Sequence, residues 1–275
     1  MPRNQCRDGK SVRRPDTGRA GCWQGGLPAG RVAGDENSYA GLWEKYLVFS
    51  EERTNLESKM ENMNGITISS NSTLEKSILL APGTEGGIPE GFTVERDARL
   101  NLKLVVMPGF SADIPMTVDI VGEGAEVTID GLCLSHGTDK VTFDVRMNHK
   151  VGHCRSNQNF RTIASGESDC RFHGRIVVAQ DAQQTEAYQE NHNLLLDERA
   201  KIETLPQLEI YADDVKCSHG ASIGNLNEDE RFYMRSRGIS EEEAKVLQMI
   251  SFAAPVMEGM PEEDRQTIEN AIREL

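Results

Sequence analysis

Between residues 65 and 226 the chain is a succession of short segments in which apolar and polar side chains alternate, separated by glycine and proline. The clearest is VTFDVRM, residues 141–147, which keeps a period of two throughout, as expected for a strand with one buried face. The others are residues 66–68, 100–104, 127–129, 175–178 and 207–211. No helical pattern of about ten residues or more separates them. A βαβ architecture is therefore excluded, and a sandwich, a barrel or a solenoid remains.

Turn residues fall between the alternating segments. They stand at Pro82-Gly83, Gly86-Gly87, Pro108-Gly109, Gly122-Glu123-Gly124, His136-Gly137 and Ser165-Gly166. Periodicity by itself does not choose among the three β architectures, and the lack of a clean sequence repeat weighs against a solenoid. An antiparallel sandwich therefore stays open at this point.

Composition indicates how the core is filled, which partners are excluded and in which compartment the protein is found. Only 5% of the residues are aromatic, so the core has to be filled mainly by aliphatic side chains, which suits stacked β layers. The net charge of −14 argues against nucleic acid as a partner, because a phosphate backbone is bound by clustered Lys and Arg. No segment approaches ~18 consecutive apolar residues, so no membrane span is expected. The six cysteines form no CxxC pair and the chain shows no export signal, which favours reduced thiols and a cytoplasmic location.

The two ends of the chain differ from the alternating region. The first 33 residues carry seven Lys and Arg against two Asp and are rich in glycine and proline. This composition predicts a disordered leader over residues 1–40, with a nucleic-acid-binding arm or a targeting segment as alternatives. Residues 41–64 are expected to form a short helical or irregular lead-in.

The pattern after the alternating region is helical, which predicts a small helical segment over residues 227–275. Ser240 and Glu243 have the spacing of a capping box at a helix start. Pro255 is expected to end or kink this helix, and Pro261 to occupy the first position of a last helix. The apolar face of the first of these helices is expected to consist of Ala244, Leu247, Ile250, Ser251 and Ala254.

Cys217 and His219 stand one residue apart in the string YADDVKCSHGASIGNL, so that on a strand their side chains point to the same face. Thiolate and imidazole are ligands of soft transition metals and iron–sulfur clusters. Because a cluster usually has four ligands, a site here needs a partner chain to complete it. The alternative is a buried thiol beside a histidine satisfied by backbone carbonyls. Asp213 and Asp214, next to Lys216, are a weaker hypothesis for orienting this strand.

A second group of potential zinc ligands lies within 25 residues: His149, His153, Cys154, Cys170 and His173. The His-x-x-x-His spacing suits a helix, but this region has the pattern of strand and turn, where positions 149 and 153 would lie about 13 Å apart. These residues are therefore expected to belong to the core and the turns. His192, between Asn191 and Asn193, is expected to be a structural histidine with its asparagine neighbours at turn positions.

Three strings resemble the core of the SufB/SufD family of iron–sulfur cluster assembly proteins, and its SufD branch in particular. They are YQENHNLLLDERAKIETLPQLEI (residues 188–210), YADDVKCSHGASIGNL (211–226) and RFYMRSRGISEEEA (231–244). The resemblance is strong over about residues 175–254 and weaker back to about residue 66. It implies a mainly β fold, a right-handed parallel β-helix over residues 65–226, followed by the small C-terminal helical segment.

The resemblance also implies a function, that of a non-catalytic scaffold subunit in a SUF-type assembly complex. It implies pairing with a SufB-like protein near Cys217 and His219, where iron or an iron–sulfur cluster is held transiently and none permanently. A SufC-like ATPase is expected to dock on the helical segment, at an exposed surface around Arg235, Arg237 and Phe252. The chain itself has no GxxxxGK[ST] loop. The alternatives are a β-helix enzyme acting on acidic polysaccharide and a degenerate scaffold without a metal site.

Overall fold

The computed structural model describes residues 65–84 and 88–275. The leader predicted for residues 1–40 and the lead-in predicted for residues 41–64 lie outside the described residues, as does the predicted turn at Gly86-Gly87.

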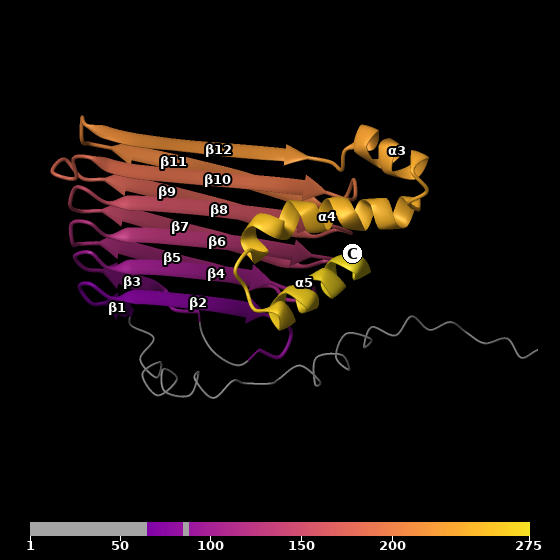
Figure 1. The fold of residues 1–275 in the computed structure, drawn as a ribbon, viewed down its shortest axis with the longest axis horizontal. Coiled ribbons are helices and arrows are strands. Elements are labelled where there is room, and N and C mark those ends of the chain that lie inside the picture. The colour runs from indigo at the N-terminus through magenta and orange to yellow at the C-terminus, as the bar shows by residue number, and fades with distance from the viewer. Residues whose placement is uncertain (1–64, 85–87) are drawn as a thin grey trace, which may run out of the picture. The chain divides into compact units, whose positions relative to one another are not determined.

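The strands form two six-stranded sheets in which the chain alternates from one sheet to the other (Figure 1). The odd-numbered sheet contains β1 (Ile66–Ile68), β3 (Gly91–Val94), β5 (Ala112–Ile120), β7 (Lys140–His149), β9 (Asp169–Val178) and β11 (Lys201–Ile210). The even-numbered sheet contains β2 (Thr73–Leu80), β4 (Arg99–Val106), β6 (Glu126–Ser135), β8 (Arg155–Ala164), β10 (Thr185–Leu195) and β12 (Val215–Gly224). Neighbouring strands are parallel in both sheets. The expected parallel β-helix is therefore confirmed in place of the sandwich, and no helix interrupts the described part of it.

The core lies between the two sheets and follows the predicted alternation. In β7, every second residue from Val141 to His149 is buried. Three rings, those of Phe143, Phe160 and Phe172, stack through the middle of the solenoid, with centroids 5.3 and 4.7 Å apart. Each coil thus covers the apolar side chains of the one before it, which is the stabilising arrangement of a solenoid.

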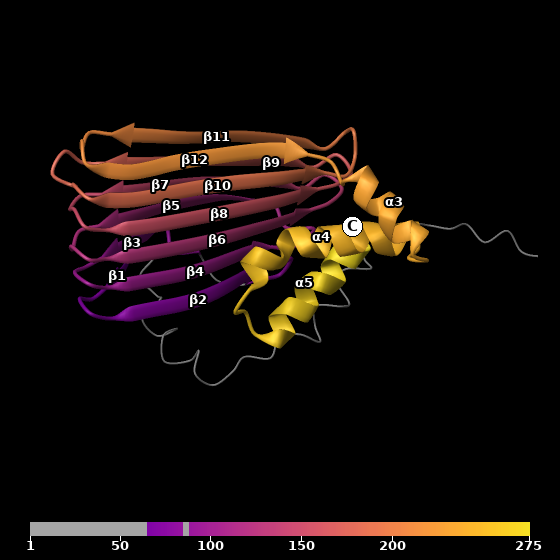
Figure 2. The ribbon, with the colours of Figure 1, turned by 45° about the horizontal axis from the view of Figure 1, so that its top comes forward.

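Three helices follow the last strand: α3 (Glu228–Ser236), α4 (Glu241–Met257) and α5 (Glu262–Glu274). Helices α4 and α5 lie against the outer face of the even-numbered sheet (Figures 1 and 2). There they form a second apolar cluster, which includes Val105, Met107, Leu132, Leu134 and Ile163 from the sheet and Met249, Ala253, Val256, Ile268 and Ile272 from the helices. Two hydrogen bonds join the layers: Lys103 Nζ donates to the Val256 carbonyl at 3.0 Å, and Arg161 Nη1 to the Phe252 carbonyl at 2.8 Å. None of the helices in the described ranges is long and apolar enough to cross a membrane.

The helical segment corrects several details of the sequence prediction. Ser240 Oγ accepts a hydrogen bond from the Glu243 amide at 3.1 Å, as a capping residue should, but the Glu243 carboxylate pairs with Arg273 of α5. Pro255 does not end α4, which runs on to Met257, and α5 begins one residue after Pro261. The predicted apolar face holds for Ala244, which is buried, and for Ile250, which packs against the second apolar cluster, whereas Leu247, Ser251 and Ala254 are exposed. The prediction missed the other buried residues of α4, which are Met249, Ala253, Val256 and Met257.

Candidate functional site

The last coil of the solenoid, β11 with β12, is open on its outer side; we call it the terminal coil. β11 pairs only with β9 and β12 only with β10, and no other described strand lies beyond them. In Figure 1 the terminal coil stands at the end of the stack opposite β1 and β2. An edge strand presents unpaired backbone N–H and C=O groups, which form a template for pairing with another chain.

Cys217 and His219 both lie on β12 and on the same face, as their spacing predicts. They are in register with Ala187 and Gln189 of β10, which point into the solenoid and are buried. Cys217 is half-buried and packs against the core, whereas His219 is exposed because no coil follows. The inward-facing column of side chains therefore ends at the molecular surface with a thiol and an imidazole.

The two side chains differ in what they offer a metal. Burial raises the pKa of the Cys217 thiol, and a backbone hydrogen bond from Ala187 opposes this only in part. The thiol is therefore protonated at neutral pH, and a metal or sulfur species has to displace that proton. Nowhere in residues 65–84 and 88–275 do three or more His, Cys, Asp or Glu side chains gather as a metal site. The terminal coil alone does not enclose a metal.

The solenoid interior beneath His219 is polar, a feature that the sequence analysis missed. Gln158, Gln189, Asn191 and Asn193 are all buried there. Gln189 Nε2 donates to Gln158 Oε1 at 3.1 Å, and Asn193 Nδ2 donates to Asn191 Oδ1 at 2.7 Å. The two asparagines therefore lie inside strand β10 and not at the turn positions predicted for them. The signal was the period of two in Gln-x-Asn-x-Asn, which continues the inward positions of the strand.

The residues considered as a zinc site do not gather into a metal site in the described structure, and four of the five have polar partners of their own. His149 ends β7 with Nε2 2.8 Å from Ser156 Oγ, and burial lowers its pKa to about 4. His153 stands in a turn with φ of 57°. The Cys154 thiol donates to the Gly152 carbonyl at 3.1 Å, the Cys170 thiol to Ser135 Oγ at 3.0 Å, and His173 lies 3.9 Å from Glu203.

The remaining polar residues near β12 tie it to β10. His192 Nδ1 lies 2.8 Å from Ser222 Oγ, which fits the structural role expected for this histidine. Lys216 pairs with Glu186 at 2.9 Å, so this ion pair, and not Asp213 or Asp214, anchors the Lys216 side chain.

Residues 220–224 also match GxSxG, the pattern that surrounds the nucleophilic serine of α/β-hydrolases. In those enzymes the serine stands on a sharp turn between a strand and a helix, whereas residues 220–224 lie within β12.

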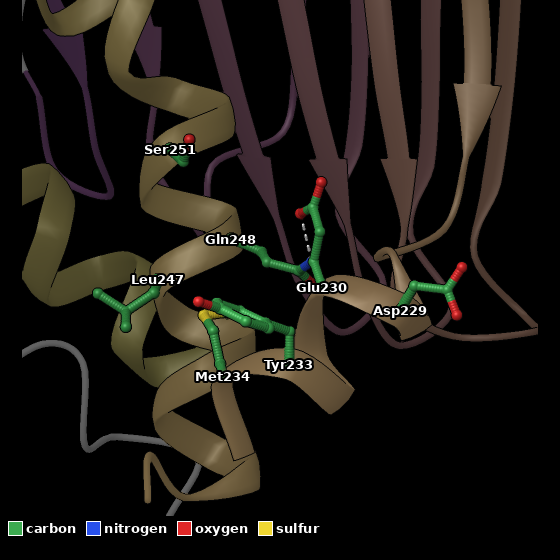
Figure 3. Close-up of a pocket in the computed structure, with 7 residues that line it drawn as sticks. All are labelled: Asp229, Glu230, Tyr233, Met234, Leu247, Gln248 and Ser251. Atoms are coloured by element: carbon green, nitrogen blue, oxygen red, sulfur yellow. Dashed lines mark hydrogen bonds between the residues drawn. The ribbon is translucent and has the colours of Figure 1, made fainter. Parts of the chain in front are cut away.

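A second surface lies between α3 and α4, where an open groove of about 520 Å³ is bounded by side chains from both helices (Figure 3). Its lining consists of Asp229, Glu230, Tyr233, Met234, Leu247, Gln248 and Ser251. We call it the α3–α4 groove. Tyr233 is 59% exposed and the neighbouring Phe232 is 72% exposed. Gln248 Nε2 donates to Glu230 Oε2 at 2.8 Å and so joins the two helices across it.

The three residues predicted to bind a partner do not form one surface. Arg235 is exposed on α3 and pairs with Glu241 at 3.1 Å. Arg237 follows α3 and lies over the Tyr233 ring, 5.3 Å from its centroid, beside the α3–α4 groove. Phe252 is half-buried, with the Arg161 guanidinium 5.2 Å from its ring centroid, and packs against the second apolar cluster. Phe252 therefore helps to hold α4 against the chain's own sheet and is not free to bind a partner.

Comparison with known proteins places the chain among iron–sulfur cluster assembly proteins. Residues 88–252 match the family described as "SUF system FeS cluster assembly, SufBD core domain". The chain is 39% identical over 142 residues to the "Iron-sulfur cluster assembly protein SufD" of Escherichia coli, which covers 52% of this chain and 34% of that protein.

Two further relatives also match part of the chain. An "Iron-sulfur cluster assembly SufBD family protein" of Synechocystis is 42% identical over 117 residues, covering 42% of this chain and 25% of the relative. The "Protein ABCI7, chloroplastic" of Arabidopsis thaliana is 36% identical over 151 residues, covering 54% and 32%. The matches thus span no more than 34% of the length of these relatives. With the solenoid, the family match over residues 88–252 shows that the chain belongs to the SufB/SufD family of the SUF iron–sulfur cluster assembly system and is SufD-like.

Proposed function

We propose that this protein is a non-catalytic scaffold subunit of a SUF-type iron–sulfur cluster assembly complex in the cytoplasm. The observation that carries the proposal is the open edge of β12, which brings an exposed His219 and a half-buried Cys217 to a surface able to pair with another chain. A SufB-like subunit is the partner that family membership favours.

In this proposal the iron or cluster is cargo that passes through an interface site. His219 is already exposed and supplies an imidazole nitrogen as ligand, whereas Cys217 supplies a thiolate only after its thiol has lost its proton. The SufB-like partner supplies the remaining ligands, since a cluster usually has four. The site is therefore formed by assembly and lost on separation, which suits transient holding.

The energy source in this proposal is a SufC-like ATPase bound at the α3–α4 groove. The groove supports this role because it presents the exposed side chains of Tyr233 and Leu247. The exposed Phe232, Arg235 and Arg237 lie next to Tyr233 on α3 or directly after it. Exposed aromatic side chains flanked by arginine are typical of protein interfaces.

The test is cluster assembly in a strain or a reconstituted complex that depends on this chain. We expect His219→Ala to reduce assembly at least about tenfold while the complex still forms, because the interface loses a ligand and little packing. Cys217→Ala should have a smaller effect, since its thiol is protonated. His173→Ala is the matched control, a partly exposed histidine on β9 that should leave assembly unchanged.

Normal assembly with His219→Ala would contradict the interface site. If assembly were also normal with Cys217→Ala, the remaining explanation would be a scaffold that only holds its partners together. Co-purification of the chain with the SufB-like and SufC-like subunits, followed by iron and sulfide analysis, distinguishes that case from a failure to form the complex.

A further inference from the structure

We propose that Gln189 is a positioning residue for His219. When the exposed His219 ring turns inward, the side-chain oxygen of Gln189 accepts a hydrogen bond from one ring nitrogen and leaves the other nitrogen free to bind iron or a cluster. This inference rests on the function proposed above for His219, and it extends the site to a buried residue of the preceding coil.

Register places the two residues one above the other. β10 and β12 are parallel neighbours, and Gln189 is paired directly with His219. Paired residues of parallel strands project from the same face, and the strands lie ~4.8 Å apart. Gln189 is 1% exposed and points into the solenoid, so the side chain of His219 starts in the same column, one coil further out. No hydrogen bond joins the two side chains in the structure, so the exposed His219 ring has to turn inward to bring a ring nitrogen to the amide.

The Gln189 amide is held firmly enough to orient a neighbour. Its Nε2 donates to Gln158 Oε1 at 3.1 Å. On the opposite sheet it lies against Gly174, where a Cβ would come within 2.5 Å of Gln189 Nε2 and 2.6 Å of Oε1. Only glycine leaves room for this amide. A hydrogen bond on one side and backbone on the other therefore confine it.

The Oε1 atom of Gln189 is the group that lacks a partner. It is buried and accepts no hydrogen bond within the part of the chain that the structure describes. A buried carbonyl oxygen without a donor is unfavourable, so an N–H that can reach it gains from pairing. The backbone of His219 lies directly above by the register, so a ring N–H becomes such a donor once the ring turns inward.

This hydrogen bond has a defined chemical consequence. A neutral imidazole carries one N–H and one nitrogen lone pair. When the N–H is donated to a fixed oxygen, the tautomer and the ring orientation are fixed as well, and the lone pair is presented to the ligand. An amide oxygen achieves this without adding a charge beneath the site.

The test measures the tautomeric state of His219 in the full chain by nitrogen-15 NMR with labelled histidine. The His219 signals are identified as those that disappear in His219→Ala. In the wild type we expect one dominant tautomer. Gln189→Met keeps the shape and removes the oxygen, and should give a mixture of tautomers. Asn191→Leu is the matched control, because Asn191 is equally buried on β10 but is paired with Ala221. It should leave the His219 tautomer unchanged.

Three results would overturn the proposal. One is tautomer averaging in the wild type, which needs no variant and so holds even if Gln189→Met fails to fold. The others are a single tautomer that survives in Gln189→Met, and a mixture that Asn191→Leu produces equally.

Assembly assays separate this inference from the proposed function. In the complex, Gln189→Met should slow cluster assembly about tenfold without weakening complex formation, and Asn191→Leu should not. Normal assembly with His219→Ala would contradict the proposed function, whatever the NMR experiment shows. Loss of assembly with His219→Ala, together with an averaged wild-type tautomer, removes only the role of Gln189.

Discussion

The inward-facing His149 shows how strongly the solenoid interior acts on a single titratable side chain. Burial lowers the pKa of this imidazole from 6.5 to about 4, because the charged form loses its water. Its Nε2 lies 2.8 Å from the Ser156 hydroxyl, a partner that suits a neutral ring. His149 is therefore neutral in the native protein at pH 7.

This shift predicts a pH dependence of stability. Between about pH 6.5 and pH 4 the unfolded chain binds a proton at His149 that the native chain does not, so stability falls as the pH falls through this window. The loss attributable to His149 is about 3 kcal/mol at pH 4 and absent well above pH 6.5. His149→Gln should lose that much less than the wild type between pH 7 and pH 4 in urea unfolding. Equal losses in the two proteins would show that His149 does not contribute.

At the scale of single residues the sequence predicted the shared face of Cys217 and His219 but not the buried amides beneath them. A thiol and an imidazole two positions apart on a strand share a face by geometry alone, and the structure places them so. Gln189 was missed because a buried amide breaks the rule that inward positions are apolar. Its partner Gln158 lies one coil earlier, and no local pattern links two residues that far apart in sequence.

Among the elements, α4 shows why a helix can be predicted and its buried face mistaken. The helix carries apolar side chains on two sides: Met249 and Ala253 face the sheet, whereas Leu247 lines the α3–α4 groove. A period of 3.6 residues identifies either stripe but not the one that is covered. The information needed to choose the covered stripe lies on the strands. At residues 104–107 the alternation gives way to a continuous apolar run, which indicates that both faces of the sheet are buried there.

The α3–α4 groove gives a prediction at the level of the element. Tyr233→Ser and Leu247→Ser should each weaken binding of the SufC-like ATPase about tenfold or more, since each removes apolar surface that the complex would bury. Ile210→Ser is the control, an exposed aliphatic side chain on β11. Binding of the ATPase to this chain alone, measured by calorimetry, is the appropriate readout.

Point variants are needed here because a deletion is ambiguous. Removing residues 239–275 would also strip α4 and α5 from the sheet and expose Val105, Leu132 and Ile163 to water. Loss of ATPase binding would then follow from misfolding alone. Unchanged affinity in both serine variants would exclude the groove as the docking surface.

For the molecule as a whole, the strands could be predicted but their parallel arrangement could not. Leu100, Val127, Ser156, Ala187 and Cys217 succeed one another in register along the even-numbered sheet. The spacing between successive members of this column varies from 27 to 31 residues. A coil of variable length leaves no fixed sequence period, so only the family resemblance favoured a solenoid.

The same architecture explains where the candidate site lies. Each coil of a solenoid is covered by the next, and the last has no successor. The helices that the structure describes do not cover it, since α4 contacts β6 and β8 on the outer face of the even-numbered sheet. The terminal coil is therefore both the least protected edge and the place where inward-facing side chains reach solvent.

The open edge gives the last prediction. Ile223 lies on β12 and is 45% exposed, and a lysine on an edge strand opposes pairing with another chain. Ile223→Lys should weaken binding of the SufB-like subunit at least about tenfold, yet leave thermal unfolding of the isolated chain almost unchanged, because the side chain is already half in water. Val121→Lys, at a 39% exposed valine between β5 and β6, should leave the affinity unchanged. If both lysines lowered the affinity equally, the partner would not be recognising the β12 edge.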